Sequence, residues 1–300
     1  MSKIVQTIFG LASVTALISG VMLRHIPSDR LPDRVLASGP PSVPYLKFDL
    51  VGTIPREASH FTQGLLFHGG ELFESTGLDP WADTPSSTFQ KTNASGVTKV
   101  LKRHKDPSIF GEGLAFLDGK FYQGTWTNHS IYVYNLKGQL IETKPYSGEV
   151  WGLTTDGKDL ILSDGTGVLK FLDPGTLKVV RSLELSEEGK PFSKTFRVVK
   201  TGSGADFNFL APNELEYVDG SIYANLYGSN DIAVFKASTG ELKARIDLSF
   251  LYDEMDLFSK AYIQSSQDFV LNGIAYDAQA KIFYVTGKDW PFIFKLQASP

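Results

Sequence analysis

Hydrophobic residues from position 45 onward lie in short apolar runs rather than at the 3.6-residue spacing of amphipathic helices. Five runs share a beginning: one polar or aromatic residue, then glycine in four of the five, then Leu or Ile. The copies begin at Gln63, Glu112, Trp151, Asn213 and Asn272. Each is followed by a turn and a second apolar, β-rich run. Strand, turn and strand in this order are the signature of a β-hairpin.

The spacing of the copies predicts the fold. They begin 49, 39, 62 and 59 residues apart. A four-stranded propeller blade occupies about 40–50 residues, so the repeat predicts one blade per copy. We therefore predict that residues 45–300 form an all-β domain, a five-bladed β-propeller. We expect residues 46–50 to lie beside residues 292–296 in the last blade and to close the ring.

Two wide spacings indicate insertions. Residues 200–209 are polar and rich in glycine, so we expect a loop there. Residues 248–265 are expected to contain a short helix with apolar side chains on one side, namely Leu251, Met255, Leu257 and Phe258. For each insertion two interpretations stay open: it shapes the rim of a site, or it is a surface segment with no role in the site.

The N-terminus is a separate segment. Residues 4–23 are charge-free and mostly apolar, long enough to span a bilayer as a helix. Residues 1–23 are thus predicted to be a transmembrane signal anchor or a cleaved signal peptide, and both interpretations stay open. Five prolines predict an extended linker over residues 24–44.

This organisation predicts a location in the secretory pathway. The domain would lie in the endoplasmic reticulum or Golgi, at the membrane or in the lumen, or outside the cell, with membrane attachment through residues 4–23. Three arginines follow the apolar run and a single lysine precedes it, although positive flanks prefer the cytoplasm. The membrane orientation is therefore left open.

Composition excludes several classes of protein. A net charge of −4 argues against a nucleic-acid binder, which needs clustered Lys and Arg. The chain has no cysteine, and none of its five histidines lies within four positions of another. Thiolate metal sites and zinc sites built on paired histidines are thus excluded. We predict no metal, no cofactor and a monomer.

Candidate chemistry lies at the first position of each copy. The innermost strands of a propeller surround its axis, so these five positions are expected to converge there. A structural repeat would place small or apolar residues at them, yet the chain places one carboxylate, three amides and one indole. Glu112 is the single acid among them. Nearby polar and aromatic candidates on the second strands include Glu74, Trp126, Tyr227 and Lys288.

Nine segments, in chain order, resemble the plant-type glutaminyl cyclases. They are 61–65 (FTQGL), 73–77 (FESTG), 110–114 (FGEGL), 151–153 (WGL), 163–165 (SDG), 213–217 (NELEY), 224–225 (AN), 271–275 (LNGIA) and 286–291 (TGKDWP). The resemblance covers essentially the whole predicted propeller. It implies a metal-independent, five-bladed enzyme that converts an N-terminal glutaminyl residue of a peptide or protein to pyroglutamate and releases ammonia.

The resemblance also implies roles for individual residues. The family's catalytic glutamate falls on Glu112. The pocket residues fall on Phe61, Gln63, Phe110, Trp126, Trp151, Asn213 and Lys288. Two departures from the family pattern stand out. Residues 78–85 replace the family's usual sequence after Gly77, and Tyr227 stands where the family has tryptophan.

The chemistry of cyclisation agrees with these assignments. The α-amine attacks the γ-carboxamide, so one carboxyl group must take the amine proton and pass it to departing ammonia, a role we give to Glu112. Gln63 and Asn213 are expected to donate hydrogen bonds to the carbonyl oxygen, and Lys288 to add positive potential. The remaining candidates are expected to bind substrate: Phe61, Phe110, Trp126, Trp151, Tyr227, Glu74 and Asn272.

Two other functions are open from the sequence. A calcium-dependent propeller lactonase or esterase would account for polar residues on the axis, but such enzymes normally have six blades and several axial carboxylates. A non-catalytic propeller that binds peptides or partners would account for Tyr227 and the altered loop over residues 78–85.

Overall fold

The computed structural model describes residues 43–56, 60–78, 85–192, 195–201, 204–266 and 268–300. The predicted anchor over residues 1–23 and nearly all of the linker lie outside these ranges. No helix in the described part of the chain is both long and apolar enough to cross a bilayer. The last linker residues pack on the domain, because Pro44 O accepts a hydrogen bond from Arg245 N and Val43 contacts the core.

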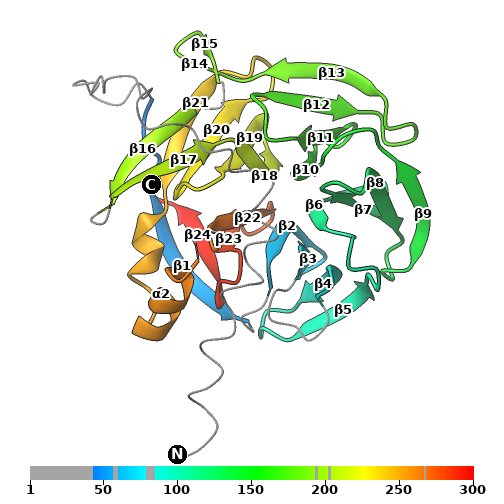
Figure 1. The fold of residues 1–300 in the computed structure, drawn as a ribbon, viewed down its shortest axis with the longest axis horizontal. Coiled ribbons are helices and arrows are strands. Elements are labelled where there is room, and N and C mark those ends of the chain that lie inside the picture. The colour runs from blue at the N-terminus through cyan, green and yellow to red at the C-terminus, as the bar shows by residue number, and fades with distance from the viewer. Residues whose placement is uncertain (1–42, 57–59, 79–84, 193–194, 202–203, 267) are drawn as a thin grey trace, which may run out of the picture. The chain divides into compact units, whose positions relative to one another are not determined.

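Five four-stranded antiparallel sheets surround a common axis, which confirms the five-bladed β-propeller (Figure 1). In the first four blades the strands follow chain order. Blade one holds β2 (Thr62–His68), β3 (Glu71–Thr76), β4 (Thr88–Thr92) and β5 (Thr98–Arg103). Blade two holds β6 (Gly111–Leu117), β7 (Lys120–Thr125), β8 (Ser130–Tyr134) and β9 (Leu140–Pro145).

Blade three holds β10 (Gly152–Thr155), β11 (Leu160–Ser163), β12 (Val168–Leu172) and β13 (Val179–Glu184). Blade four holds β18 (Pro212–Val218), β19 (Ser221–Leu226), β20 (Asp231–Lys236) and β21 (Leu242–Asp247). Between them stand two hairpins, β14 (Ser186–Glu187) with β15 (Lys190–Pro191), and β16 (Thr195–Thr201) with β17 (Gly204–Leu210).

Blade five combines the two ends of the propeller. It holds β22 (Leu271–Asp277), β23 (Ile282–Gly287), β24 (Phe292–Ala298) and β1 (Phe48–Pro55). Phe48 pairs with Ala298 and Leu50 with Leu296, so the predicted ring closure is confirmed. The strand begins two residues later than predicted and continues to Pro55. This pairing covers an edge that would otherwise be open.

The innermost strands are β2, β6, β10, β18 and β22 (Figure 1), and each carries one copy of the sequence repeat. The repeated glycine lets these strands approach closely. A Cβ atom on Gly152 would lie 1.9 Å from the Asn213 carbonyl oxygen, and one on Gly113 would lie 2.2 Å from the Leu153 nitrogen. A side chain at either position would collide with the backbone of the next blade.

Blade four carries Glu214 where the other copies carry glycine, and this side chain links three blades. Its carboxylate accepts hydrogen bonds from Leu65 N in blade one at 3.2 Å and Ile274 N in blade five at 2.8 Å. Burial raises the pKa of Glu214 well above its ordinary value, and the two backbone donors oppose that rise. Glu214 therefore acts as a structural bond across the axis.

The segment 200–209 was predicted as a loop, but its described residues, 200–201 and 204–209, lie in strands β16 and β17. Thr195 pairs with Leu210 and Thr201 with Gly204. The prediction was wrong because it rested on the polar, glycine-rich composition of this segment and overlooked the strand that precedes it. Glycines at a hairpin turn are compatible with strands on both sides.

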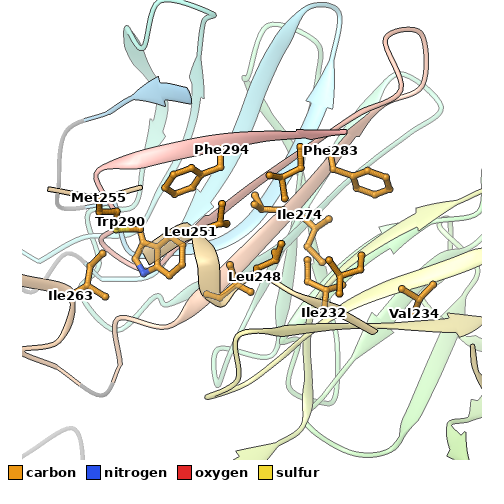
Figure 2. Packing of buried hydrophobic residues seen from close by; sticks show 14 of the residues in the cluster. Ile232, Val234, Leu248, Leu251, Met255, Ile263, Ile274, Phe283, Trp290 and Phe294 are labelled. Carbon is orange, nitrogen blue, oxygen red and sulfur yellow. The ribbon is translucent and has the colours of Figure 1, made fainter. Parts of the chain in front are cut away.

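The helical insertion lies between blades four and five. It comprises the 3-10 helix η3 (Ser249–Tyr252) and α2 (Leu257–Ile263), and Figure 2 shows Leu251, Met255 and Ile263 close to the buried indole of Trp290. Leu257 and Phe258 are 79% and 87% exposed, so the predicted common face is wrong for these two. The Asp256 side chain caps α2, so the helix begins after Met255 and packs through its far end.

Candidate active site

Nearly all the predicted site residues lie at one edge of the inner sheets. Gln63, Glu112, Asn213 and Asn272 stand near the start of a first strand, whereas Trp126, Tyr227 and Lys288 follow the end of a second strand. Because the first and second strands of a blade are antiparallel, these ends meet at the same face of the propeller. Glu74 is the exception, because it lies inside β3.

A local irregularity turns the first residue of four copies out of the regular strand pattern. The pairing of the first two strands shifts register at this point in blades one, two, four and five. The displaced residues are Gln63, Glu112, Asn213 and Asn272, each at or beside the shift. Such β-bulges re-aim side chains, which places polar groups at the axis without breaking the sheets.

Glu112 is the central titratable group. It is 5% exposed, and its Oε1 accepts a hydrogen bond from Gln63 Nε2 at 3.2 Å. Asn272 Nδ2 in turn donates to Gln63 Oε1 at 3.1 Å, so the amide of Gln63 is held with its nitrogen toward the carboxyl group. Burial raises the pKa of Glu112 well above its ordinary value; Lys288 opposes this rise and Glu149 adds to it.

Five aromatic side chains form what we call the aromatic belt: Phe61, Phe110, Trp126, Trp151 and Tyr227. Ring centroids are 6.2 Å apart for Phe61 and Phe110, 5.8 Å for Phe110 and Trp126, and 6.3 Å for Trp151 and Tyr227. All five side chains are partly exposed. Glu112 is more deeply buried than the aromatic belt and interacts electrostatically with Tyr227.

Two charged groups link the remaining members of the aromatic belt. Lys288 Nζ lies 4.9 Å from the ring centre of Tyr227 and 5.1 Å from that of Phe61. Glu149 Oε2 accepts hydrogen bonds from the indole nitrogens of Trp126 and Trp151. The aromatic belt with these two links forms a closed circuit. Burial lowers the pKa of Lys288, whereas the Glu112 carboxylate opposes that shift.

Two buried amides have free hydrogen-bonding groups. The Asn213 side chain is 3% exposed and makes no hydrogen bond to another described residue. Asn272 Oδ1 is likewise buried without a partner among the described residues. Buried polar groups are normally satisfied, so these amides are suited to meet a polar ligand.

Glu74 has a different environment. Its carboxylate accepts hydrogen bonds from Arg56 Nη1, Thr62 Oγ1 and Gln90 Nε2 at 2.5, 2.5 and 2.8 Å, and His60 Nδ1 is 3.4 Å away. Burial by itself would raise the pKa of Glu74, but the Arg56 guanidinium overcomes it and holds this pKa well below its ordinary range. Both oxygens are thus occupied by protein donors.

Comparison with known proteins shows the family to which the chain belongs. The model of the family described as glutamine cyclotransferase matches residues 31–298. The chain belongs to the glutamine cyclotransferase family. It is 33% identical over 258 residues to the glutaminyl-peptide cyclotransferase of Arabidopsis thaliana, covering 84% of this chain and 71% of that protein.

A solved structure supports the same assignment. The crystal structure of Myxococcus xanthus glutaminyl cyclase is similar to this chain with a TM-score of 0.69 and 29% sequence identity, over 86% of this chain and all of that one. Membership of the glutamine cyclotransferase family confirms the resemblance read from the nine segments. It also favours an enzyme over a propeller that only binds partners.

The structure brings most of the predicted site residues together. These are Gln63, Glu112, Asn272, Lys288 and the aromatic belt, and Asn213 lies at the same edge. Glu74, inside β3, lies apart from them. Tyr227, one of the two departures, takes its place in the aromatic belt, and its hydroxyl donates to Asp268 Oδ1 at 3.1 Å. The other departure, residues 78–85, lies almost entirely outside the described residues.

Sequence reasoning missed Glu149, Asp268 and Arg56. Glu149 lies in the segment between β9 and β10, and Asp268 follows the helical insertion. None of the three occupies a repeated position, so the repeat that identified the other residues could not find them. The one local signal for any of them was the position of Glu149 two residues before Trp151, close enough in the chain for their side chains to meet.

A surface groove lies apart from this site. It has a cavity volume of about 590 Å³ and is lined by His129, Tyr146, Lys170 and Lys178, among others. None of the residues of the aromatic belt lines it. Among the described residues there is no group of three or more His, Asp or Glu side chains placed to hold a metal ion.

Proposed function

We propose that this site cyclises the N-terminal glutaminyl residue of peptides and proteins to pyroglutamate, with Glu112 as the proton-transfer group. The observation that carries the proposal is a buried carboxyl group with a raised pKa, which is hydrogen-bonded to Gln63 and interacts electrostatically with Lys288 and with Tyr227 of the aromatic belt. A carboxyl group that holds its proton toward neutral pH is suited to protonate a poor leaving group.

The reaction balances with the groups present. The substrate's neutral α-amine forms a bond to its own γ-carboxamide carbon, and the carbon–nitrogen bond of that amide breaks. Glu112 gives its proton to the departing nitrogen and receives one from the attacking amine, so ammonia leaves and the carboxyl group is regenerated. A free α-amine has a pKa near 7.7–8.0, so an appreciable fraction is neutral at physiological pH.

Gln63, Asn213 and Lys288 are assigned to the carbonyl oxygen. The Asn213 amide is buried, and the Lys288 ammonium interacts electrostatically with Glu112. Donors placed before the reaction stabilise the developing oxyanion without reorganising. The aromatic belt would enclose the glutaminyl side chain and exclude water, which suppresses hydrolysis to glutamate.

The direct test is product formation. A Gln-initiated dipeptide incubated with the protein is expected to lose one ammonia and give the pyroglutamyl product, measured by mass spectrometry and ammonia release. The same dipeptide with an acetylated α-amine is the control, because it lacks the nucleophile. Absence of pyroglutamyl product above the uncatalysed rate would refute the proposal.

We further propose that the protein acts as a monomer in the secretory pathway, attached to or directed by residues 4–23. The charge-free run and the Pro-rich linker support this location. Fractionation of cells with protease protection tests the location and orientation, and light scattering of the purified protein tests the monomer. A protein found entirely in the cytosol would refute the location.

A further inference from the structure

Glu149 is a charged residue at the site for which the reaction sequence has no role. It lies between β9 and β10 and is partly exposed. Its Oε2 accepts a hydrogen bond from Trp126 Nε1 at 3.1 Å and another from Trp151 Nε1 at 2.9 Å. One carboxylate oxygen thus receives both indoles.

The two indoles come from different blades. Trp126 follows the second strand of blade two, and Trp151 precedes the first strand of blade three. Each indole has a further ring neighbour, Phe110 for Trp126 and Tyr227 for Trp151. Glu149 therefore joins the two halves of the aromatic belt at the boundary between blades.

The backbone around Glu149 is held on both sides. Val150 N donates to Thr125 O at 3.2 Å, and Trp151 N donates to Ser163 O at 2.9 Å. Val150 is fully buried and packs closely against Gly124, because a Cβ atom on Gly124 would lie 2.3 Å from Val150 Cγ1. The carboxylate is thus carried on a fixed segment rather than a free loop.

We propose that Glu149 is a positioning residue, which fixes Trp126 and Trp151 as two walls of the substrate pocket by accepting both indole N–H groups. The proposal deepens the proposed function, on which it rests, by assigning the residue that shapes the glutaminyl pocket. Indole has a single donor and no acceptor, so one carboxylate oxygen defines the orientation of each ring.

The charge of Glu149 has a second consequence at Glu112. The groups that face Glu112 are the Gln63 amide, the Lys288 ammonium, the Tyr227 ring and the Glu149 carboxylate. Lys288 is itself influenced by Asp268 and Asp289. Among these groups Glu149 contributes the negative charge that raises the pKa of Glu112.

Two variants separate the hydrogen bonds from the charge. Glu149→Gln keeps an oxygen able to accept both indoles and removes the charge, whereas Glu149→Ala removes both. We expect KM for a Gln-initiated dipeptide to rise about tenfold in Glu149→Ala and to stay within about threefold in Glu149→Gln. The limb of the pH–rate profile that reports ionisation of Glu112 is expected to move to lower pH in Glu149→Gln.

A structural readout accompanies the kinetics. In the full-length chain labelled with ¹⁵N-tryptophan, Trp126→Phe and Trp151→Phe assign the two indole N–H resonances. Both are expected to shift in Glu149→Ala, while that of Trp290, which donates to Phe269 O at 3.0 Å, stays in place. Glu142→Gln, on exposed strand β9, is the matched control and should alter neither the resonances nor KM.

The outcomes distinguish this proposal from the one on which it rests. Unchanged Trp126 and Trp151 resonances in Glu149→Ala, or a KM within threefold of the parent in that variant, would overturn the positioning role. If the parent made no pyroglutamyl peptide, the proposed function would fail, while the indole resonances would still show whether Glu149 fixes the two rings.

Discussion

Glu74 and Glu112 are both buried glutamates, one on the second strand of blade one and the other on the innermost strand of blade two, yet their surroundings shift their pKa values in opposite directions. They are 1% and 5% exposed. Glu74 accepts hydrogen bonds from the Arg56 guanidinium and two other donors, so its pKa lies below the ordinary range. Glu112 meets one amide and a more distant ammonium, so burial dominates and its pKa lies above that range.

The comparison shows what separates a structural carboxylate from a reactive one. Both lose the stabilisation of water, and the partner decides the result. A buried carboxylate beside a guanidinium stays ionised and has little tendency to exchange a proton. A buried carboxyl group without such a partner holds its proton toward neutral pH, where proton transfer is useful. Burial alone therefore does not identify a catalytic acid.

The sharpest test of the comparison is Glu112→Gln. The amide keeps the size and the hydrogen-bonding capacity of the side chain and removes the titrating group. We expect kcat to fall by roughly 10²–10⁴, the usual contribution of a positioned acid–base group. The melting temperature should match the parent, because a neutral amide costs less to bury than a carboxylate. Activity within threefold of the parent would remove Glu112 from the mechanism and make Glu74 the leading candidate.

Glu74→Gln is expected to act on stability instead. Loss of the carboxylate leaves the Arg56 guanidinium buried without its ion-pair partner, so the free energy of unfolding should fall by about 3–5 kcal/mol. The rate per folded molecule should fall much less than in Glu112→Gln. Glu71→Gln, three residues earlier and bonded to Lys91 at the partly exposed surface, is the control and should cost at most about 1 kcal/mol. Denaturant unfolding measures both.

The depressed pKa of Glu74 also predicts how the free energy of unfolding changes as the pH falls. The folded-state pKa of Glu74 is depressed, so its stabilisation is present above the unfolded-state pKa and is lost as the pH falls. Unfolding free energy measured from neutral to acidic pH should therefore decline less steeply in Glu74→Gln than in the parent. Equal slopes in the two proteins would contradict the ionised state assigned to Glu74.

Asn213→Ala tests the oxyanion donors without touching either carboxyl group. Loss of one such donor typically lowers kcat by about 10²–10³. Because Glu112 is unchanged, the shape of the pH–rate profile should be retained. A variant with the parental kcat, or with a displaced pH profile, would show that Asn213 does not act on the carbonyl oxygen.

Lys288→Met tests the electrostatic balance at Glu112. The Lys288 ammonium lowers the pKa of Glu112, so its removal should raise that pKa further. The limb of the pH–rate profile that reports ionisation of Glu112 is then expected to move to higher pH, opposite to the shift expected for Glu149→Gln. A shift in the same direction for both variants would show that this limb reports another group.

The smallest effect is expected from chelation. The reaction assigned to Glu112 is a proton transfer between the attacking amine and the departing nitrogen, and it has no step for a metal ion. We expect kcat to be unchanged after treatment with a chelator and dialysis. If a chelator abolished the activity and added zinc or calcium restored it, the metal-free proton transfer assigned to Glu112 would be contradicted.

Repeated features of the structure were predictable and single features were not. The five copies of the repeat located the inner strands, ring closure and the polar residues at the axis, because each copy carries the same turn and strand signals. Glu149 and Arg56 occur once, and their partners Trp126 and Glu74 lie 23 and 18 residues away. The local sequence does not encode these two contacts; the one local signal was the position of Glu149 two residues before its other partner, Trp151.

The helical insertion shows the same limit. Its apolar residues predicted a helix, yet Leu257 and Phe258 face solvent while Leu251 and Met255 are buried. Which apolar residues are buried depends on where the Asp256 cap starts the helix and on the surface offered by blade five. Hydrophobicity by itself does not contain that information.

The sequence alone determined the five-bladed architecture through repeat spacing and turn residues, and the family and Glu112 as the candidate acid through the nine segments that resemble it, because all of these are local properties of the chain. The tertiary structure alone decided the charge states of Glu74 and Glu112, the closed aromatic circuit and the place of Glu149 within it. A pKa and a shared hydrogen-bond acceptor depend on groups that meet only after the ring closes, when burial removes water and leaves the nearest protein partner to set the free energy of each charge.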